Sequence, residues 1–410
     1  MTITEWIAGT ALPVDVDGPP RQLEPLRRIV GDAVVVGIGG STYGAHEQFT
    51  LAATIIRYLV EELGFRAVAT EDDWDVALDL DRYVLTGEGD LAALVRGSGV
   101  PWQTAEVRDT VAWIRDYNVA HPLDPVRFVG VGVIDTRPAV YDLVADYVRS
   151  AAPDRLERLE ALFAPIRPTR PDHLRWFFTE ATDHESFVTN AWAALELVEG
   201  VPHADGDRAW ALAVQHTRQI VGVYEHYTHH VVEDGYRDLA MAENLRWWHG
   251  YTGARIAYWS TNAHSVDGKE VTISIPPKGQ ITFAPTGGHL REFFGTGYVS
   301  IGLTFDHGTV NSAWGLPPFQ RQPVPMPPVP TDFAEYPLRT VPRPSYLLEL
   351  GTDAPDEVGQ WLAAPARTRV IGSICDPGRP PEEYWMTGGS LVEWYDALVH
   401  VQQVGPTKGL

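Results

Sequence analysis

The stretch VVVGIGGSTYGAHEQF, residues 34–49, decides the fold prediction for this chain. Residues 32–39 form a short β-branched run that ends in glycine, which is typical of a buried strand. Ser41 or Thr42 is expected to cap the helix that follows, whose apolar positions recur at helical spacing until Gly64. The stretch therefore predicts a strand, a tight turn and a helix.

More strands and helices follow in alternation. Residues 65–70 (FRAVAT) are expected to form a second strand, residues 105–117 a helix and residues 126–134 (VRFVGVGVI) a third strand. This order implies a mainly parallel central sheet flanked by helices on both faces, which is an α/β fold. Further strands are expected at residues 253–260, 279–284, 297–305 and 345–349.

Two later segments interrupt the alternation. Residues 138–248 contain no convincing strand, and their long helical periods are rich in Ala, Leu, Glu and Arg. We therefore predict one domain over residues 1–410 that carries a helical insertion subdomain at about 138–248. The proline-dense residues 317–337 are expected to form an extended surface loop, because proline has no amide hydrogen for a sheet interior.

Composition limits the classes of function. The formal net charge of −22 argues against nucleic acid or an anionic membrane as a partner, because both would repel the protein. Cys375 is the only cysteine, which excludes an intrachain disulfide and a cysteine-based metal cluster. The N-terminus lacks a basic, apolar leader, and no segment reaches the roughly 18 apolar residues of a membrane helix. We expect a soluble, cytoplasmic protein.

The turn after the first strand carries the first candidate site. Side chains that follow a parallel strand lie at the carboxyl edge of the sheet, where open α/β folds bind ligands. Tyr43, His46 and Glu47 are placed in this way, and His46 is a candidate general base that Glu47 or Glu71 would orient. The alternative is that His46 and Glu47 only occupy the first turn of a helix. The glycines match neither GxGxxG nor a P-loop, so no nucleotide cofactor is expected.

Acidic residues follow the second strand, in ATEDDWDVA (residues 69–77). Glu71 comes first beyond the apolar run and is expected to face the ligand-binding edge. Asp72 and Asp73 are instead expected to cap the next helix.

A polar loop follows a later strand, in YWSTNAHSVDG (residues 258–268). Thr261, Asn262 and His264 are expected at the same edge of the sheet as Glu71. For His264 a satisfied structural role is an equally good interpretation.

Other catalytic and metal-binding patterns are weak. His226 and His230 lie four apart, as on one face of a zinc-binding helix, but the pattern is not HExxH and no third ligand is evident. No metal and no other cofactor is therefore expected. The chain also has no G-x-S-x-G motif, so any chemistry must come from acid and base groups.

Several motifs, in order, resemble the erythromycin esterase family, which is also called succinoglycan-biosynthesis-like. GIGGSTYGAHEQF (residues 37–49) corresponds to the family turn G-E-x-[ST]-H-G-x-x-E-F, and LVEELGFRAVATE (residues 59–71) to the helix and strand after it. The other counterparts are WIRDYN (113–118), YRDLAMAENLRWW (236–248), STNAH (260–264), GYVSIGLTF (297–305) and EWYDALVHV (393–401). The resemblance covers nearly the whole chain and implies an α/β sheet with a helical insertion.

The resemblance also implies an altered site. Family esterases open a macrolactone with water that a histidine activates without metal, and that histidine falls on Tyr43. The other departures are Gly40 for the turn glutamate, Ala52 for an arginine and Thr261 for a second histidine. The matching positions are Glu47, Glu71 and His264.

Tyrosine titrates near pH 10 and is a poor base for water at neutral pH. The first hypothesis is therefore an enzyme repurposed for non-hydrolytic proton transfer, such as cyclisation, elimination or isomerisation, with Tyr43, His46, Glu71 and His264 as its catalytic groups. The second is a macrolactone or ester hydrolase that uses His46 as a relocated base. The third is a non-catalytic metabolite-binding protein, for example in self-resistance.

Aromatic residues near these segments suggest a polyketide-like or other apolar metabolite as the ligand. Trp247 and Trp248 have helical spacing from Met241 and Leu245 and are expected in the core. The expected substrate-binding residues are Glu47, Thr261, Asn262, Trp259 and, within YRDLAMAENLRWW, Arg237.

Overall fold

The computed structural model describes residues 1–230, 235–314, 320–351 and 354–410. Within them, a nine-stranded sheet runs in the order β1-β10-β13-β8-β2-β5-β3-β4, with β9 beside β8. Neighbours from β13 to β4 are parallel, whereas the β1–β10, β10–β13 and β8–β9 pairs are antiparallel. The mainly parallel α/β sheet expected from the sequence is confirmed. Its strands are β1 (Leu12–Pro13), β2 (Val35–Gly40), β3 (Ala67–Asp73), β4 (Arg127–Gly132), β5 (Ile256–Thr261), β8 (Tyr298–Trp314), β9 (Gln320–Met326), β10 (Ser345–Glu349) and β13 (Ala397–Val404).

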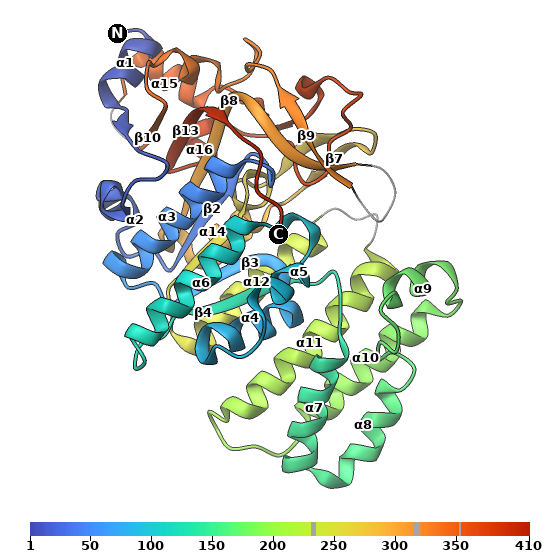
Figure 1. Cartoon of the computed structure of the whole chain (residues 1–410). Helices are drawn as coiled ribbons and strands as arrows, with labels where there is room; N and C mark the ends of the chain where they lie inside the picture. Colours follow the sequence, from blue (N-terminus) through green and yellow to red (C-terminus); the bar gives the residue numbers. More distant parts are fainter. Residues whose placement is uncertain (231–234, 315–319, 352–353) are drawn as a thin grey trace.

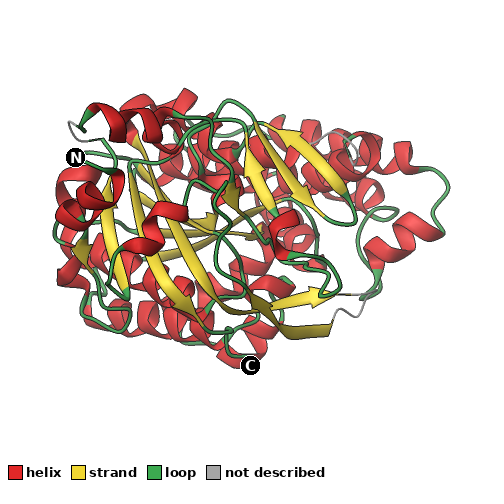
Figure 2. Cartoon of the chain, turned by 90° about the horizontal axis from the view of Figure 1, so that it is seen from above, coloured by secondary structure: helices red, strands yellow, loops and turns green. Residues whose placement is uncertain are grey.

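Helices lie on both sides of this sheet (Figures 1 and 2). The α-helices before β5 are α1 (Ile3–Thr10), α2 (Leu26–Val30), α3 (His46–Leu63), α4 (Trp74–Thr86), α5 (Leu91–Arg96), α6 (Ala105–Ala120), α7 (Pro138–Ala151), α8 (Leu156–Phe163), α9 (His173–Thr179), α10 (His184–Glu199), α11 (Arg208–His229) and α12 (Tyr236–Thr252). Those after β5 are α13 (Asn262–Ser265), α14 (Thr286–Phe294), α15 (Asp356–Ala363) and α16 (Leu391–Trp394).

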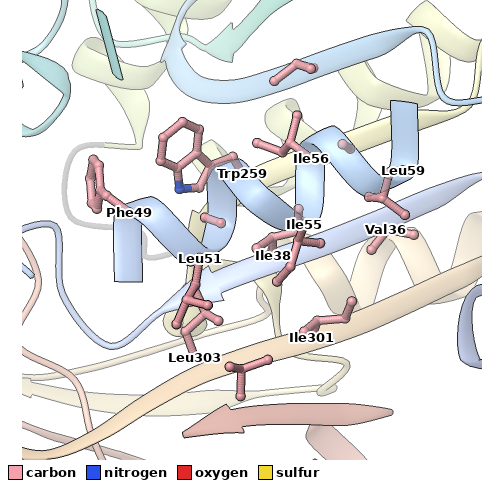
Figure 3. Packing of buried hydrophobic residues seen from close by; sticks show 14 of the residues in the cluster. Val36, Ile38, Phe49, Leu51, Ile55, Ile56, Leu59, Trp259, Ile301 and Leu303 are labelled. Carbon is pink, nitrogen blue, oxygen red and sulfur yellow. The ribbon is translucent and has the colours of Figure 1, made fainter. Parts of the chain in front are cut away.

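Alternate residues of the central strands face opposite helices, as the two-residue period of a strand requires. Val36 and Ile38 of β2 and Trp259 of β5 belong to the apolar cluster that contains α3 (Figure 3). Val35 and Tyr258 belong instead to a cluster with residues of α12 and α14. This alternation determines which side chains near the strand ends meet α3 and which meet α12.

The start of α3 differs from the expectation. The helix begins at His46, and its N-cap, Ala45, has no side-chain cap. The Ser41 hydroxyl donates to the Leu303 carbonyl, and the Thr42 hydroxyl accepts from the Gly44 amide. Ser41 and Thr42 therefore shape the loop rather than cap the helix.

The end of α3 agrees with the expectation. Gly64 follows the last helical residue with φ +74°, a left-handed conformation that glycine adopts without strain.

The prediction of a loop over residues 317–337 was wrong in part. Within it, Gln320–Met326 form β9, which pairs with the C-terminal half of β8; residues 317–319 lie outside the described residues. Pro323 and Pro325 are two residues apart in β9, so both place their ring nitrogens on the same edge of the strand. A strand that pairs on one edge tolerates proline in this register.

Between β4 and β5 the described residues form helices and the loops that connect them, and no strand. Residues of α7 to α11 build an apolar cluster of their own, and these helices stand to one side of the sheet in Figure 1. None of the described helices combines the length and the apolar character needed to cross a membrane.

A smaller antiparallel sheet runs in the order β11-β12-β6-β7. The sequence predicted its β7 but not its neighbour β6. Its strands are β6 (Val271–Ile275), β7 (Gly279–Phe283), β11 (Thr368–Arg369) and β12 (Trp385–Thr387).

Candidate functional site

The candidate site lies where β2, β5 and β3 end, three strands that are neighbours in the sheet. Tyr43 follows β2, Glu71 lies within β3, and Ser260 and Thr261 end β5. The structure thus brings together residues that are far apart in the sequence, at the carboxyl edge where α/β sheets bind ligands.

Glu71 is the centre of the site. Its Oε1 accepts hydrogen bonds from the Ser260 hydroxyl and from the Thr261 amide at 3.0 Å. Its Oε2 accepts from the Tyr43 hydroxyl and from Arg237 Nη2 at 3.4 Å. The Glu71 side chain is 1% exposed, so these donors replace water around a buried carboxylate.

The first turn of α12 supplies Arg237 and Asp238, and α13 supplies His264. His264 Nδ1 lies 2.8 Å from Asp238 Oδ1, and its Nε2 lies 3.9 Å from Glu71 Oε2. Arg237 and His264 keep 27% and 15% of their side-chain surface accessible although protein surrounds them. They can therefore reach a ligand while being shielded from bulk water.

Tyr43 is held as a neutral phenol. Burial and the neighbouring Glu71 carboxylate raise the pKa of Tyr43 well above its usual range, and Arg237 offsets them only in part. Tyr43 can donate a hydrogen bond or a proton, but it cannot serve as a base at neutral pH.

Arg237 remains a cation. Burial opposes its charge, but Glu71 and other neighbours override burial and raise the pKa of Arg237. Its Nε is buried without a hydrogen-bond partner in the described part of the chain. The guanidinium therefore has one hydrogen-bond donor, its Nε–H, that its contact with Glu71 does not use.

His264 and Asp238 stabilise each other's charge. Burial favours the neutral form of each, yet Asp238 and Glu71 raise the pKa of His264, and His264 lowers the pKa of Asp238. The site therefore combines the Arg237 cation, Glu71 and the His264–Asp238 pair beside the neutral phenol of Tyr43.

His46 lies apart from the Glu71 contacts. Its Nδ1 is 2.6 Å from Oε1 of the buried Glu106, at the start of α6. Glu106 also accepts from the Lys408 amide at 3.0 Å. The expectation that Glu47 or Glu71 would orient His46 was wrong. Glu47 points elsewhere and accepts from the Gly405 amide at 2.7 Å.

The residues around the end of β5 make different contacts. Trp259 is 2% exposed and packs on Phe49 and Trp102, because the strand alternation turns it toward α3. It therefore does not lie beside Glu71. Thr261 reaches Glu71 through its backbone amide, and Asn262 donates to the Leu303 carbonyl at 3.1 Å.

The two other acids of β3 do not cap α4. Asp73 occupies the N-cap position, but its carboxylate accepts from the Ile134 amide at 2.6 Å. Asp72 accepts from the amides of Asp73 and Gly99, both at 3.1 Å. Both carboxylates satisfy backbone groups of neighbouring segments.

The paired histidines lie near the end of α11. His230 stacks on Tyr236 at a ring distance of 4.3 Å, and His226 stacks on the same ring at 6.0 Å. Across the four described ranges, no group of three or more His, Cys, Asp or Glu side chains is arranged to hold a metal ion.

Sequence reasoning missed Ser260, Asp238 and Glu106. Ser260 lies one residue before the predicted loop residues, and Asp238 follows Arg237 directly. The two-residue period of β5 could have identified Ser260, because Tyr258 and Ser260 must share the face opposite Trp259. Glu106 lies 60 residues from His46, and no local pattern connects the two.

Comparison with known proteins gives consistent results. The family model described as erythromycin esterase matches residues 60–404. Erythromycin esterase type II of Escherichia coli is 25% identical over 169 residues, which are 40% of this chain and 40% of that protein. The chain therefore matches less than half the length of this curated relative.

Solved structures match the whole fold. A Bacillus cereus protein is 25% identical, with a TM-score of 0.85 over 100% of this chain and 98% of its own. A succinoglycan biosynthesis protein is 24% identical, with a TM-score of 0.81 over 99% and 97% of the two chains. The erythromycin esterase mutant EreC, in its open conformation, is 20% identical, with a TM-score of 0.72 over 95% of each chain. The last two similarities establish the fold alone.

Proposed function

This chain belongs to the erythromycin esterase family, and we propose that it is an enzyme repurposed for non-hydrolytic acid–base chemistry on a small metabolite. The reaction class is cyclisation, elimination or isomerisation, and the substrate is polyketide-like or otherwise largely apolar. The observation that carries the proposal is the hydrogen bond from the Tyr43 phenol to Glu71. The resemblance puts a water-activating histidine at this position, and a phenol with a raised pKa cannot replace it as a base.

The surroundings of Glu71 favour an orienting role for this carboxylate. Each of its oxygens already accepts hydrogen bonds within the described residues, so few lone pairs remain to take a substrate proton. Tyr43 then acts as the proton donor to a substrate oxygen. Arg237 and His264, both cationic, stabilise the negative charge that develops there.

A second candidate function is hydrolysis with His46 as the base. It is favoured by the 2.6 Å contact between His46 Nδ1 and Glu106, since a buried carboxylate on one ring nitrogen orients the other as a proton acceptor. The His46 side chain is 26% exposed, so a ligand can approach it. This dyad lies outside the network around Glu71, and the two candidates are therefore separable by mutation.

The test is incubation of the purified protein with a macrolactone panel and with extracts of its source organism, followed by mass spectrometry. Loss of water, or a product of unchanged mass and altered retention, supports the first function. Gain of one water supports hydrolysis. A ligand recovered intact indicates binding alone.

Variants then assign the residues. Tyr43→Phe should abolish the non-hydrolytic product, whereas the control Tyr83→Phe, on the half-buried face of α4, should retain it. His46→Ala should abolish hydrolysis and leave the other product. If Tyr43→Phe and Glu71→Gln both leave turnover of the identified substrate unchanged, the first function is wrong.

A further inference from the structure

Asp238 is a buried carboxylate beside the candidate site that contacts both His264 and Thr286. It lies in the first turn of α12 and is 3% exposed. Its Oδ1 contacts His264 Nδ1 at 2.8 Å and accepts from the Thr286 amide at 2.9 Å and the Thr286 hydroxyl at 2.8 Å. Three contacts from two separate segments, α13 and the start of α14, thus converge on one carboxylate oxygen and hold it in one position.

This arrangement determines which nitrogen of His264 meets the site. Because Nδ1 faces Asp238, Nε2 is the ring nitrogen that remains, and it lies 3.9 Å from Glu71 Oε2. The same Glu71 oxygen accepts the Tyr43 hydroxyl. The Phe283 ring, at 5.7 Å, packs beside the imidazole. The ring therefore presents Nε2 to the carboxylate that orients Tyr43.

We infer that Asp238 is a positioning residue of this site: it orients the His264 ring, keeps it as an imidazolium and thereby sets the alkaline limit of the reaction. The inference rests on the proposed function for its effect on turnover. Its effect on the ring itself is independent of any substrate. Asp238 touches neither Glu71 nor Tyr43 in the contacts above and acts through His264.

The charged groups around His264 support this assignment. Asp238 and Glu71 favour the imidazolium, while burial and Arg237 oppose it. If Asp238 were neutral, Glu71 would be the one carboxylate of this group left beside two positive charges, those of Arg237 and His264. Arg237 holds its proton far more strongly than an imidazole does. His264 is therefore the group that would lose a proton.

The first experiment measures the ring directly. Histidine labelled with ¹³C and ¹⁵N is titrated by NMR in the wild type and in Asp238→Asn, with the His264 signal assigned from His264→Gln. We expect the pKa of His264 to fall by at least about one unit, as on removal of an opposite charge within hydrogen-bond distance. At neutral pH a larger fraction of the His264 rings should then be neutral. Glu243→Gln removes an exposed carboxylate from the same helix and should leave the His264 titration unchanged.

Thr286→Val separates charge from hydrogen bonding, because it deletes the hydroxyl contact and leaves the Asp238 charge in place. His264 should stay protonated in this variant. Thr286→Val also tests the inference if Asp238→Asn does not fold. A His264 pKa that is unchanged in Asp238→Asn, or that falls equally in Thr286→Val, overturns the inference.

Turnover provides the second readout. In Asp238→Asn the alkaline limb of the rate profile should move to lower pH in step with the NMR value, with kcat affected more than KM. If the NMR value falls and the limb stays in place, the role of His264 in the proposed function is refuted while its orientation by Asp238 stands.

Discussion

Asp75 is a buried carboxylate that should weaken the fold once it ionises. It lies in the first turn of α4 and is 5% exposed. Neither of its oxygens has a hydrogen-bond partner in the described part of the chain, although the backbone amides of Val76 and Arg137 lie close enough to favour its ionised form. Burial raises the pKa of Asp75 to about 7; Arg137 opposes the shift and Asp135 adds to it.

The magnitude follows from the two pKa values. Between 3.8 in the unfolded chain and about 7 in the fold, the difference is about 3 units. At 1.36 kcal/mol per unit, the ionised carboxylate costs about 4 kcal/mol of folding free energy. Because the folded value is the higher one, the fold carries no penalty where Asp75 is protonated in both states, below about pH 4. The penalty grows from there and is complete above about pH 7.

Asp75→Asn should therefore stabilise the protein increasingly as the pH rises. Relative to wild type, its gain in unfolding free energy should be larger at about pH 8 than at about pH 4 by up to about 4 kcal/mol. The comparison between the two pH values isolates the charge, because the packing cost of the amide is common to both. Urea unfolding across this range measures the effect.

The control is Asp79→Asn, which neutralises a more exposed carboxylate on the same helix and should show little pH dependence. An Asp75→Asn variant that shifts the stability equally at all pH values would refute the reasoning. It would mean that Asp75 ionises as readily in the fold as in the unfolded chain.

Three further substitutions test the architecture around the site. Gly44→Ala would place a Cβ 1.9 Å from the Asn311 carbonyl oxygen, a backbone atom that cannot move aside. We expect this variant to lose about 2 kcal/mol of unfolding free energy in thermal unfolding, and to turn over substrate more slowly. Unchanged stability would contradict the close approach of the two backbone segments. Glu71→Gln leaves Arg237 without its charge partner and should destabilise the fold by about 3 kcal/mol in urea; a neutral effect would mean that water or another group compensates. Glu47→Gln weakens a charge-assisted hydrogen bond to the backbone of the C-terminal segment. It should therefore lower the free energy of unfolding by about 1 kcal/mol without changing the reaction product. A changed product would place Glu47 in the site instead.

Much of the architecture was predictable because it depends on local pattern. The β-branched run before Gly37 and the glycine at position 64 predicted β2 and the end of α3, and the structure confirms both. Proline-rich β9 was not predictable, because its pairing depends on which edge of a strand meets β8 rather than on composition.

The site was predictable only in outline. The residue types at the strand ends indicated Tyr43, Glu71 and His264, which the fold brings together around one carboxylate. The same reasoning placed Trp259 at the site, although it lies on the α3 face. A shift of one residue along a strand moves a side chain to the opposite face of the sheet. The sequence did not reveal which alternate residues of β5 face α3.

The sequence by itself determined the alternation of strands and helices and the glycine turn. Only the tertiary structure decided the partners: Glu106 for His46, Asp238 for His264, and Ser260 with Arg237 for Glu71. The physical reason is that propensities and periodicity act over a few residues, whereas these contacts join segments separated by 26 to 189 positions. Strand order, register and helix packing bring such segments together, and these features exist only in the folded chain.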